Sequence, residues 1–304
     1  MIDVVMATYN GEKYLDMQIL SIINQTYKDW LLYVHDDGST DNTLEILSFW
    51  AAKDKRIKII NDDCLHLGPG NNFFYLFPYC SSDYICFCDQ DDIWFENKLE
   101  VYIETMKNFD NSIPVCALFS AYVWNETQGC VTPFLNEYCK DVNSLFFTGG
   151  TQGCSMVFNK KLVEIAKEFV DANIFLHDYL VMLIAMTFGY VIYKDTRLMF
   201  YRQHSSNVTT HMPKNMIEKI KTALVENYNV SFVSPKMYED ISTFFEILKD
   251  KMDADQYRLY TTYLKLPKLS PIQRFVKLLF SSYRIGKHSR FYFILKYLLR
   301  KKYL

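Results

Sequence analysis

The 304-residue sequence lacks the signals of several large protein classes. It holds no uninterrupted apolar run of about 18 residues, so no segment is expected to span a membrane. No basic and then apolar leader stands at its start, so no secretory signal is expected. Its eight cysteines form no C-x-x-C pair and lie mostly in apolar runs, which favours reduced core thiols in a cytosolic protein over disulfides or a metal centre.

Glycine loops that cradle phosphate are also missing. No G-x-G-x-x-G follows the first apolar run, and G-x-x-x-x-G-K-[ST] occurs nowhere in the sequence. Backbone capture of a bare phosphate is therefore not indicated. The polar turns contain acids instead, which suit a diphosphate bridged by a metal ion.

Acidic residues are absent from the C-terminal part of the chain. The formal net charge is −2, but no Asp or Glu follows Asp255, whereas 12 of the 33 Lys and Arg residues do. The other 21 basic residues stand against all 35 acidic ones, so the preceding part carries −14 and the C-terminal part +12. The two parts are expected to face different partners.

The sequence has ample material for a core. Hydrophobic residues make up 50% and aromatic residues 16% of a chain long enough for one large domain with an appendage, or for two domains. Its first 110 residues alternate between short apolar runs and helical periodicity. Strands are predicted over 2–7, 30–35, 56–61 and 84–88, and helices over 12–25, 41–53 and 71–80. This order predicts an α/β fold with a mostly parallel, doubly wound sheet and helices on both faces.

The second half changes character. Strands are predicted over 115–124, 154–158 and 191–201, and helices over 160–170, 177–188, 214–232, 235–251 and 254–266. Since only helices are predicted after the last strand, we expect a first domain over residues 1–212 and a helical C-terminal region over 213–304.

Three polar turns follow strands of the predicted parallel sheet: 8–10, 35–37 and 89–92. In such sheets ligands bind beyond the carboxyl ends of the strands, so these turns should converge on one crevice. The turn Asp89-Gln90-Asp91-Asp92 packs three carboxylates into four residues, and their mutual repulsion favours a cation between them. Mg²⁺ or Mn²⁺ is the natural ion. The alternative is an acidic turn that caps a helix starting near Ile93.

Two further polar positions stand out. His177 and Asp178 open a predicted helix, where Asp178 is either a first-turn acid or a functional group. His204 follows the last predicted strand, where it is either a loop residue or a ligand. The glycine-rich stretch 148–153 ends at Gly153, where a backbone could approach a ligand closely.

Taken together, the motifs resemble, in order, those of the family 2 inverting glycosyltransferases with the GT-A fold. The chain is most similar to their rhamnosyltransferase-like branch, which builds bacterial surface polysaccharides such as capsule and O-antigen. The resemblance covers about residues 1–210. It rests on ATYNG (7–11), SIINQTY (21–27), DDGSTD (36–41), LGxGxNF (67–73), DQDDIW (89–94), GCSMVFN (153–159), HD (177–178) and YRQHxxN (201–207).

The resemblance implies a role for each matching residue. Asp178 would be the catalytic base, and Asp91 and His204 would bind the metal, Mn²⁺ or Mg²⁺. Asp37 would hydrogen-bond a pyrimidine base, and Asp89 would lie toward the ribose or donor sugar. The other nucleotide-binding residues implied are Thr8, Tyr9, Asn10, Glu12, Asp36, Asn72 and Gln90. The residues implied for the acceptor or donor-sugar pocket are Asp92, Trp94, Gly153, Cys154 and His177.

The implied reaction is metal-dependent transfer of a sugar, such as rhamnose, glucose or galactose, from a UDP- or TDP-sugar to a hydroxyl of a growing, lipid-linked polysaccharide. The nucleotide-binding half would end near residue 110 and the acceptor half would occupy 111–212. Two other hypotheses are a sugar-nucleotide nucleotidyltransferase and a non-catalytic, membrane-associated scaffold with a nucleotide pocket. The first would need a basic, glycine-rich loop near the N-terminus, which residues 8–13 supply poorly.

The basic segment 268–304 is predicted to bind the inner face of the bacterial plasma membrane, making the protein cytoplasmic and peripheral. An apolar helical stripe is predicted there, formed by Ile272, Phe275, Val276, Leu279, Phe280 and Tyr283. A basic amphipathic helix of this kind suits an anionic membrane. The alternative is packing on the first domain or in a homodimer. Nucleic acid is not expected, because the segment is more apolar than a phosphate-binding arm requires.

Overall fold

The computed structural model describes residues 1–62, 64–134, 139, 141–147, 152–204, 234–281 and 283. The chain forms two compact units. Unit 1 comprises Met1–Asn136 and Gly150–Val208, and unit 2 comprises Glu137–Gly149 and Thr209–Leu304. The predicted domain boundary after residue 212, the predicted helix 214–232 and most of the basic segment 268–304 lie outside the described residues.

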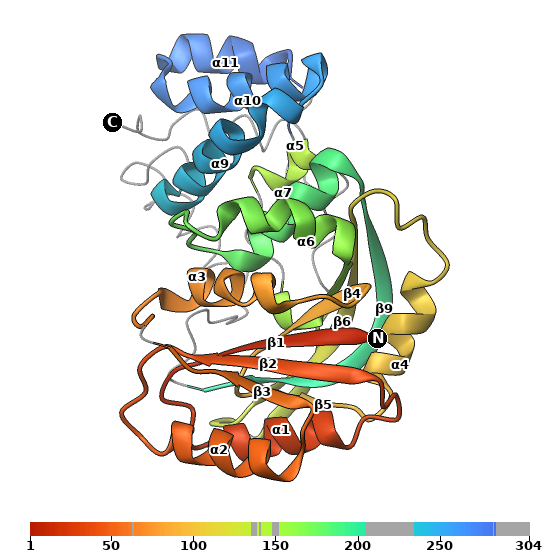
Figure 1. Cartoon of the computed structure of the whole chain (residues 1–304). Coiled ribbons are helices and arrows are strands. Elements are labelled where there is room, and N and C mark those ends of the chain that lie inside the picture. The colour runs from red at the N-terminus through yellow and green to blue at the C-terminus, as the bar shows by residue number, and fades with distance from the viewer. Residues whose placement is uncertain are drawn as a thin grey trace. The chain divides into compact units, whose positions relative to one another are not determined.

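Unit 1 is built on a nine-stranded sheet with the order β3-β2-β1-β4-β8-β6-β9-β5, and β7 pairs with β6 (Figure 1). The strands are β1 (Ile2–Thr8), β2 (Trp30–Asp36), β3 (Ile57–Ile60), β4 (Tyr84–Cys88), β5 (Ile93–Trp94), β6 (Val115–Asn125), β7 (Cys130–Phe134), β8 (Met156–Asn159) and β9 (Tyr190–Gln203). The first four strands in space are parallel, as predicted. Beyond β4 the sheet is mixed, since β8 runs antiparallel to both β4 and β6.

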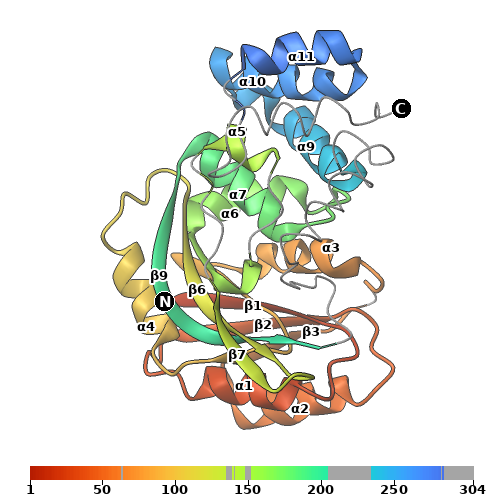
Figure 2. The same ribbon diagram turned by 180° about the vertical axis from the view of Figure 1, so that it is seen from behind.

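Helices cover both faces of this sheet, as Figures 1 and 2 show. The alternation of β1 sends Ile2, Val4 and Met6 into one core with α1 (Leu15–Ile23), α2 (Thr43–Lys53) and α4 (Lys98–Met106). Phe87 of β4 faces the other way, toward α3 (Gly68–Tyr75) and α7 (His177–Phe188). Shorter helical segments of unit 1 are α6 (Lys160–Ala166), η1 (Phe77–Tyr79), η2 (Gly153–Ser155) and η3 (Lys167–Phe169).

Two predicted helix starts in unit 1 are wrong. Ile93 and Trp94 form β5, paired with Phe200 and Met199 of β9, and the helix begins only at Lys98. The short helix predicted from residue 71 begins at Gly68, because a carboxylate from the loop after β2 caps it. Both errors come from partners distant in sequence.

Unit 2 is helical over its described residues. It contains α5 (Val142–Leu145), α9 (Pro235–Leu248), η4 (Lys249–Lys251), α10 (Ala254–Lys265), η5 (Leu266–Lys268) and α11 (Pro271–Leu279). Capping boxes at Asp253 and Ser270 begin α10 and α11. The core is aromatic, with Phe146 packed on Tyr260 and Tyr263.

Over the described residues, none of the helices has the length and apolar character needed to cross a bilayer.

Candidate active site

Three loops meet at the carboxyl edge of the parallel strands, as predicted. The Gln90 carboxamide joins the loops after β4 and β1, since it accepts from the Tyr9 N–H and donates to the Tyr9 carbonyl, both at 3.0 Å. Asn10 joins the loop after β1 to the loop after β2, because its N–H donates to Ser39 Oγ at 2.8 Å. Its φ of 47° is left-handed, a conformation in which Asn is enriched. The three loops therefore form one connected rim.

Thr8 and Asp36 hold the base of this rim. Both side chains are buried, and the Thr8 hydroxyl donates to the Asp36 carboxylate at 2.8 Å. Asp36 also accepts from the N–H groups of Gly38 and Ser39 and from the Ser39 hydroxyl. A carboxylate with these four donors has little capacity for a ligand, so the main role of Asp36 here is to shape the turn.

Glu12 lies at the start of α2. Its Oε2 accepts from the N–H and the side-chain amide of Asn42, at 2.9 and 2.7 Å. An anion at this end of a helix is favourable, because the unpaired N–H groups carry partial positive charge. In this structure Glu12 therefore anchors α2 to the loop after β1.

Asp37 and Asn72 link β2 to α3. The two Asp37 oxygens accept from the N–H groups of Leu67 and Gly68, at 2.7 and 2.9 Å. Asn72 is buried, and its Oδ1 lies 2.6 Å from Nδ1 of His35. A pyrimidine bound at Asp37 would share the carboxylate with the two backbone donors.

Asp91 and His204, the predicted metal ligands, lie together. His204 Nε2 is 2.8 Å from Asp91 Oδ2, and the two side chains are only 10% and 13% exposed. The two residues lie 113 positions apart in sequence, so the fold brings them together. Carboxylate oxygen and imidazole nitrogen are both suitable ligands for Mn²⁺, and the oxygen also suits Mg²⁺. The pair therefore fits the implied cation.

Three residues that sequence reasoning missed surround this pair. The Tyr14 ring stacks on His204 with centroids 4.4 Å apart. Arg202 donates through Nε to the Asp91 carbonyl at 2.8 Å, and its guanidinium lies 4.8 Å from the Tyr14 ring centroid. Glu126 accepts from the Tyr14 hydroxyl at 2.9 Å and lies 3.6 Å from the Arg202 guanidinium. These contacts hold His204 over Asp91.

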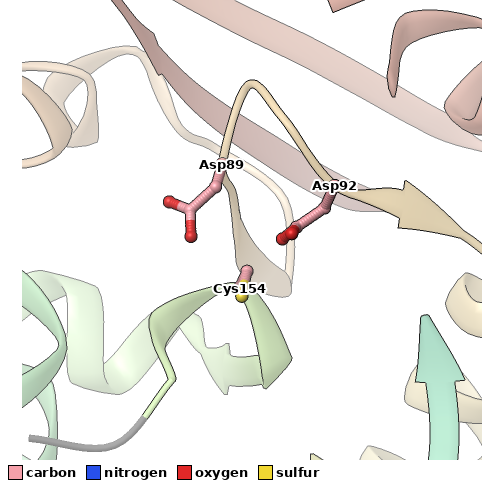
Figure 3. Close-up of side chains that lie close together, drawn as sticks. All are labelled: Asp89, Asp92 and Cys154. Atoms are coloured by element: carbon pink, nitrogen blue, oxygen red, sulfur yellow. The ribbon is translucent and has the colours of Figure 1, made fainter. Parts of the chain in front are cut away.

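Asp89, Asp92 and Cys154 form a second group, which we call the acid cluster (Figure 3). Their ligand atoms lie within 4.8 Å of one another, and the side chains of Asp92 and Cys154 are fully buried. Figure 3 shows both carboxylates on the side of the loop that faces Cys154. Asp92 Oδ1 accepts from the Arg202 N–H at 3.1 Å, whereas its Oδ2 has no hydrogen-bond partner among the described residues.

Burial sets the protonation of the acid cluster. Burial, and then the charge of Asp91, raise the pKa of Asp89 to about 7. The same two causes raise the pKa of Asp92 well above its usual range. Burial also raises the pKa of the Cys154 thiol, so the sulfur is protonated at neutral pH.

Lys98 lies beneath the acid cluster and is fully buried. Its Nζ donates to the Cys154 carbonyl at 2.7 Å and lies 3.9 Å from the Trp94 ring centroid. Burial lowers the pKa of this ammonium group. Trp94, which the resemblance put in the sugar pocket, is 3% exposed and belongs to the core under Lys98.

The turn η2 joins the acid cluster to α7. A Cβ on Gly153 would stand 2.6 Å from His177 Nε2 and 3.3 Å from Asp178 Cβ, so a glycine is needed for this approach. Asp178 is 8% exposed and accepts from the Tyr179 N–H at 2.7 Å, which orients its carboxylate. Because Cys154 follows Gly153 in the chain, the same turn contacts Asp178 through Gly153 and the acid cluster through Cys154.

His177 is packed behind this turn. Its ring centroid lies 4.1 Å from that of Phe73 and 4.6 Å from that of Phe87. Burial lowers the pKa of His177 to about 3, so the imidazole is neutral at physiological pH. Its buried Nε2 has no hydrogen-bond partner among the described residues. These contacts make His177 a packing residue of this face.

Comparison with known proteins identifies the family. Residues 3–166 match the model of glycosyl transferase family 2. The chain is 34% identical over 213 residues to the dTDP-rhamnosyl transferase RfbG of Shigella flexneri, a match that spans 66% of this chain and 72% of that protein. The chain therefore belongs to glycosyl transferase family 2, and it is a glycosyltransferase.

A shorter match joins the chain to UDP-Glc:alpha-D-GlcNAc-diphosphoundecaprenol beta-1,3-glucosyltransferase WfgD of Escherichia coli. The two are 38% identical over 107 residues, which is 35% of this chain and 41% of the relative. The match thus spans less than half of that protein.

Solved structures confirm the GT-A fold. A mannosyltransferase from Pyrobaculum calidifontis in complex with GDP-Man and Mn²⁺ has a TM-score of 0.54 at 12% identity, covering 91% of this chain and 74% of that one. The structure of S. aureus TarS 1-349 in complex with UDP has a TM-score of 0.52 at 15% identity. This match covers 98% of this chain and 88% of that one. At these identities the likeness concerns the fold alone.

Proposed function

We propose that the chain transfers a sugar, with inversion, from a dTDP- or UDP-sugar to a hydroxyl of a growing surface polysaccharide. Rhamnose is the first choice of sugar, because the S. flexneri relative, matched over 66% of this chain, is a dTDP-rhamnosyl transferase. Glucose is the second, because the E. coli relative is named for UDP-Glc, and galactose remains to be tested beside them. Membership of a glycosyltransferase family argues against both the nucleotidyltransferase and the scaffold hypothesis.

The proposed cation is Mn²⁺ or Mg²⁺, held by Asp91 and His204. When bound, it would neutralise the charge that develops on the departing nucleoside diphosphate. The protein's own part is to position the two ligands, which the Tyr14 stack and the Arg202 hydrogen bond do. Asp92 is fully buried and its Oδ1 already accepts from the Arg202 N–H, so it is less available to a cation than Asp91.

Asp178 is the proposed general base. One observation supports this proposal: Gly153 lies against Asp178, and the next residue, Cys154, lies against Asp89 and Asp92. A base beside the acids that follow β4 can accept the proton of an acceptor hydroxyl as that oxygen attacks the sugar. A single displacement of this kind inverts the anomeric centre, and it needs no nucleophilic carboxylate.

The test is transfer with a panel of UDP-, dTDP- and GDP-sugars and Mn²⁺, using wild type and Asp178→Asn. We expect Asp178→Asn to lower transfer by about 10²-fold or more, since a general base contributes 10²–10⁴-fold. Asp171→Asn, at an exposed acid in the same unit, is the matched control and should transfer like wild type. If Asp178→Asn transfers sugar within a few-fold of the wild-type rate, Asp178 is not the general base.

We also propose a lipid-linked acceptor, met by a peripheral protein at the inner membrane face. Support comes from the name of the E. coli relative, which includes diphosphoundecaprenol, and from the cationic charge after Asp255. Transfer to a lipid-diphosphate-linked acceptor should exceed transfer to the same glycan released from lipid. Equal rates with both acceptors would contradict the lipid requirement.

A further inference from the structure

The apolar residues of α11 face outward. Its fully buried side chains are Arg274 and Leu278. The residues that we call the outer stripe are Ile272 (78% exposed), Phe275 (39%), Val276 (47%), Leu279 (42%) and Phe280 (82%). Four of them follow the spacing i, i+3, i+4, i+7, so they share one side of the helix, and Phe280 adjoins them at its end. A helix that only packs on its own domain turns such a stripe inward. The outer stripe is therefore suited to contact with an apolar environment outside the core of unit 2.

The buried side of α11 is held by polar contacts. The Arg274 guanidinium donates to the carbonyls of Leu266, Pro267 and Leu269, at 3.2 to 3.4 Å. These carbonyls belong to η5 and to the residue after it, so Arg274 ties α11 to the segment that follows α10. Figures 1 and 2 show α10 and α11 side by side. Since Arg274 fixes α11 from within, the stripe is not required for this attachment.

A cavity of about 350 Å³ opens at the end of the outer stripe. Phe280 lines it, so the cavity and the stripe are continuous. Its charged lining residues are Arg258, Lys277 and Asp255, and its hydroxyl side chains include Thr262 and Ser281. Two cations against one acid leave the cavity positive, and hydroxyl groups add donors. This combination fits the phosphate of a lipid headgroup.

We propose that α11 docks unit 2 on a membrane that contains anionic phospholipid. The outer stripe enters the boundary between headgroups and acyl chains, while Arg258 and Lys277 receive a lipid phosphate. This proposal rests on the proposed function, because docking on the membrane would bring the enzyme to its lipid-linked acceptor. A second copy of the chain fits less well. The α11 helix of a second copy would bring no acid to Arg258 and Lys277, because α11 contains none, whereas a lipid phosphate supplies the negative charge.

The first test is flotation of the full chain with vesicles of phosphatidylcholine alone or mixed with phosphatidylglycerol. Wild type should bind the mixed vesicles about tenfold more tightly, at low salt, than neutral ones. The double variant Ile272→Ser/Phe280→Ser should lose about tenfold or more in binding to mixed vesicles, because it removes two buried apolar side chains from the bound state. Leu44→Ser/Phe49→Ser, at two exposed apolar residues of α2, is the matched control and should bind like wild type.

The second test addresses the charge. Arg258→Gln/Lys277→Gln should reduce the preference for phosphatidylglycerol to about threefold or less, whereas Lys28→Gln/Lys55→Gln, at exposed cations of unit 1, should leave it unchanged. The proposal fails if wild type does not bind mixed vesicles, or if the stripe variant and the charge variant both bind them like wild type. It also fails if the stripe variant only converts a dimer to a monomer, since a second copy would then be the occupant.

A lipid-free assay separates the two proposals. Metal-dependent release of nucleotide from the donor sugar should be equal in wild type and all four double variants, because none of these residues belongs to the candidate active site. If the wild-type chain releases no nucleotide from any donor sugar, the proposed function is wrong. The membrane proposal is then tested by flotation alone.

Discussion

Asp91 and Asp92 are neighbours in sequence, yet they lie in opposite electrostatic settings. Asp91 faces the rim and shares a 2.8 Å contact with the imidazole of His204. Asp92 faces inward, where its side chain is fully buried and its pKa is raised well above the usual range. Asp91 lies in the turn after β4, whereas Asp92 directly precedes β5. The loop after β4 thus carries one proposed metal ligand, Asp91, and one buried acid, Asp92.

This contrast teaches that a run of carboxylates is not one site. On the rim side the Asp91 carboxylate contacts the imidazole of His204, whereas on the inner side burial raises the pKa of Asp92, which lies above the buried Lys98. Under the proposed function a metal ion replaces the rim contact, whereas the inner contacts belong to the packing of the fold.

The largest effect is expected on the rim side. Asp91→Asn removes a charged ligand, so metal-dependent nucleotide release should fall by about a hundredfold or more, since a cation contributes several kcal/mol to such a reaction. Calorimetric Mn²⁺ titration should show the matching loss of affinity. Asp83→Asn, an exposed acid at the other end of β4, is the control. Unchanged Mn²⁺ binding in Asp91→Asn would break the contrast, because the ion would then be held by the inner acids.

On the inner side, Lys98→Met should destabilise the fold by about 2 kcal/mol, because the Cys154 carbonyl loses a charged donor. Urea unfolding measures this change. Lys107→Met, at the exposed end of α4, should be neutral within about 0.5 kcal/mol. A Lys98→Met variant as stable as wild type would mean that the protonated acid cluster needs no cation beneath it.

His177 should make the fold acid-sensitive. Burial lowers its folded-state pKa from 6.5 to about 3, so below pH 6.5 the unfolded chain gains a proton that the folded chain cannot accept. Its contribution to stability is therefore lost as the pH falls, by on the order of 1 kcal/mol per pH unit down to about pH 3. Unfolding measured at pH 7 and 5 should show a smaller drop for His177→Gln than for wild type. His66→Asn, at an exposed histidine, should keep the wild-type drop.

The smallest effect is expected at Tyr14. Tyr14→Phe keeps the ring on His204 and loses the bond to Glu126, so its Mn²⁺ affinity should stay within about twofold of wild type. Tyr14→Ala loses the ring as well and should weaken Mn²⁺ binding by about fivefold. Equal affinities for both variants in the same titration would show that His204 reaches Asp91 without the stack.

Local patterns were sufficient to predict much of the fold. β1, β2, β4 and α7 lie close to their predicted ranges, because each has a continuous apolar run or a clear helical period. The α/β class and the convergence of three strand-end loops followed from that order alone. β5 was missed because two residues carry no period of their own, and their strand exists only through pairing with β9.

The candidate site divides in the same way. Asp91 and His204 were predicted as partners because each belongs to a recognisable motif. Tyr14 and Glu126 were missed because they meet across 112 residues and neither stands in a run of like residues. Arg202 offered a signal, since it stands two residues before His204 in the same motif. The hydrogen bonds that occupy Asp37 and Glu12 could not be predicted, because a sequence does not show which backbone N–H groups will lie near a carboxylate.

The clasp between Gln90 and Tyr9 bears on how fast a donor can be captured. Two hydrogen bonds already hold the loops after β1 and β4 together. A donor that binds there therefore has little backbone to order, so its association should resemble docking to a rigid surface. A Cβ at Gly11 would stand 2.3 Å from Gln90 Oε1. Gly11→Ala should therefore break the Gln90–Tyr9 hydrogen bonds, and donor binding should become slower because the loops would have to order as well as bind.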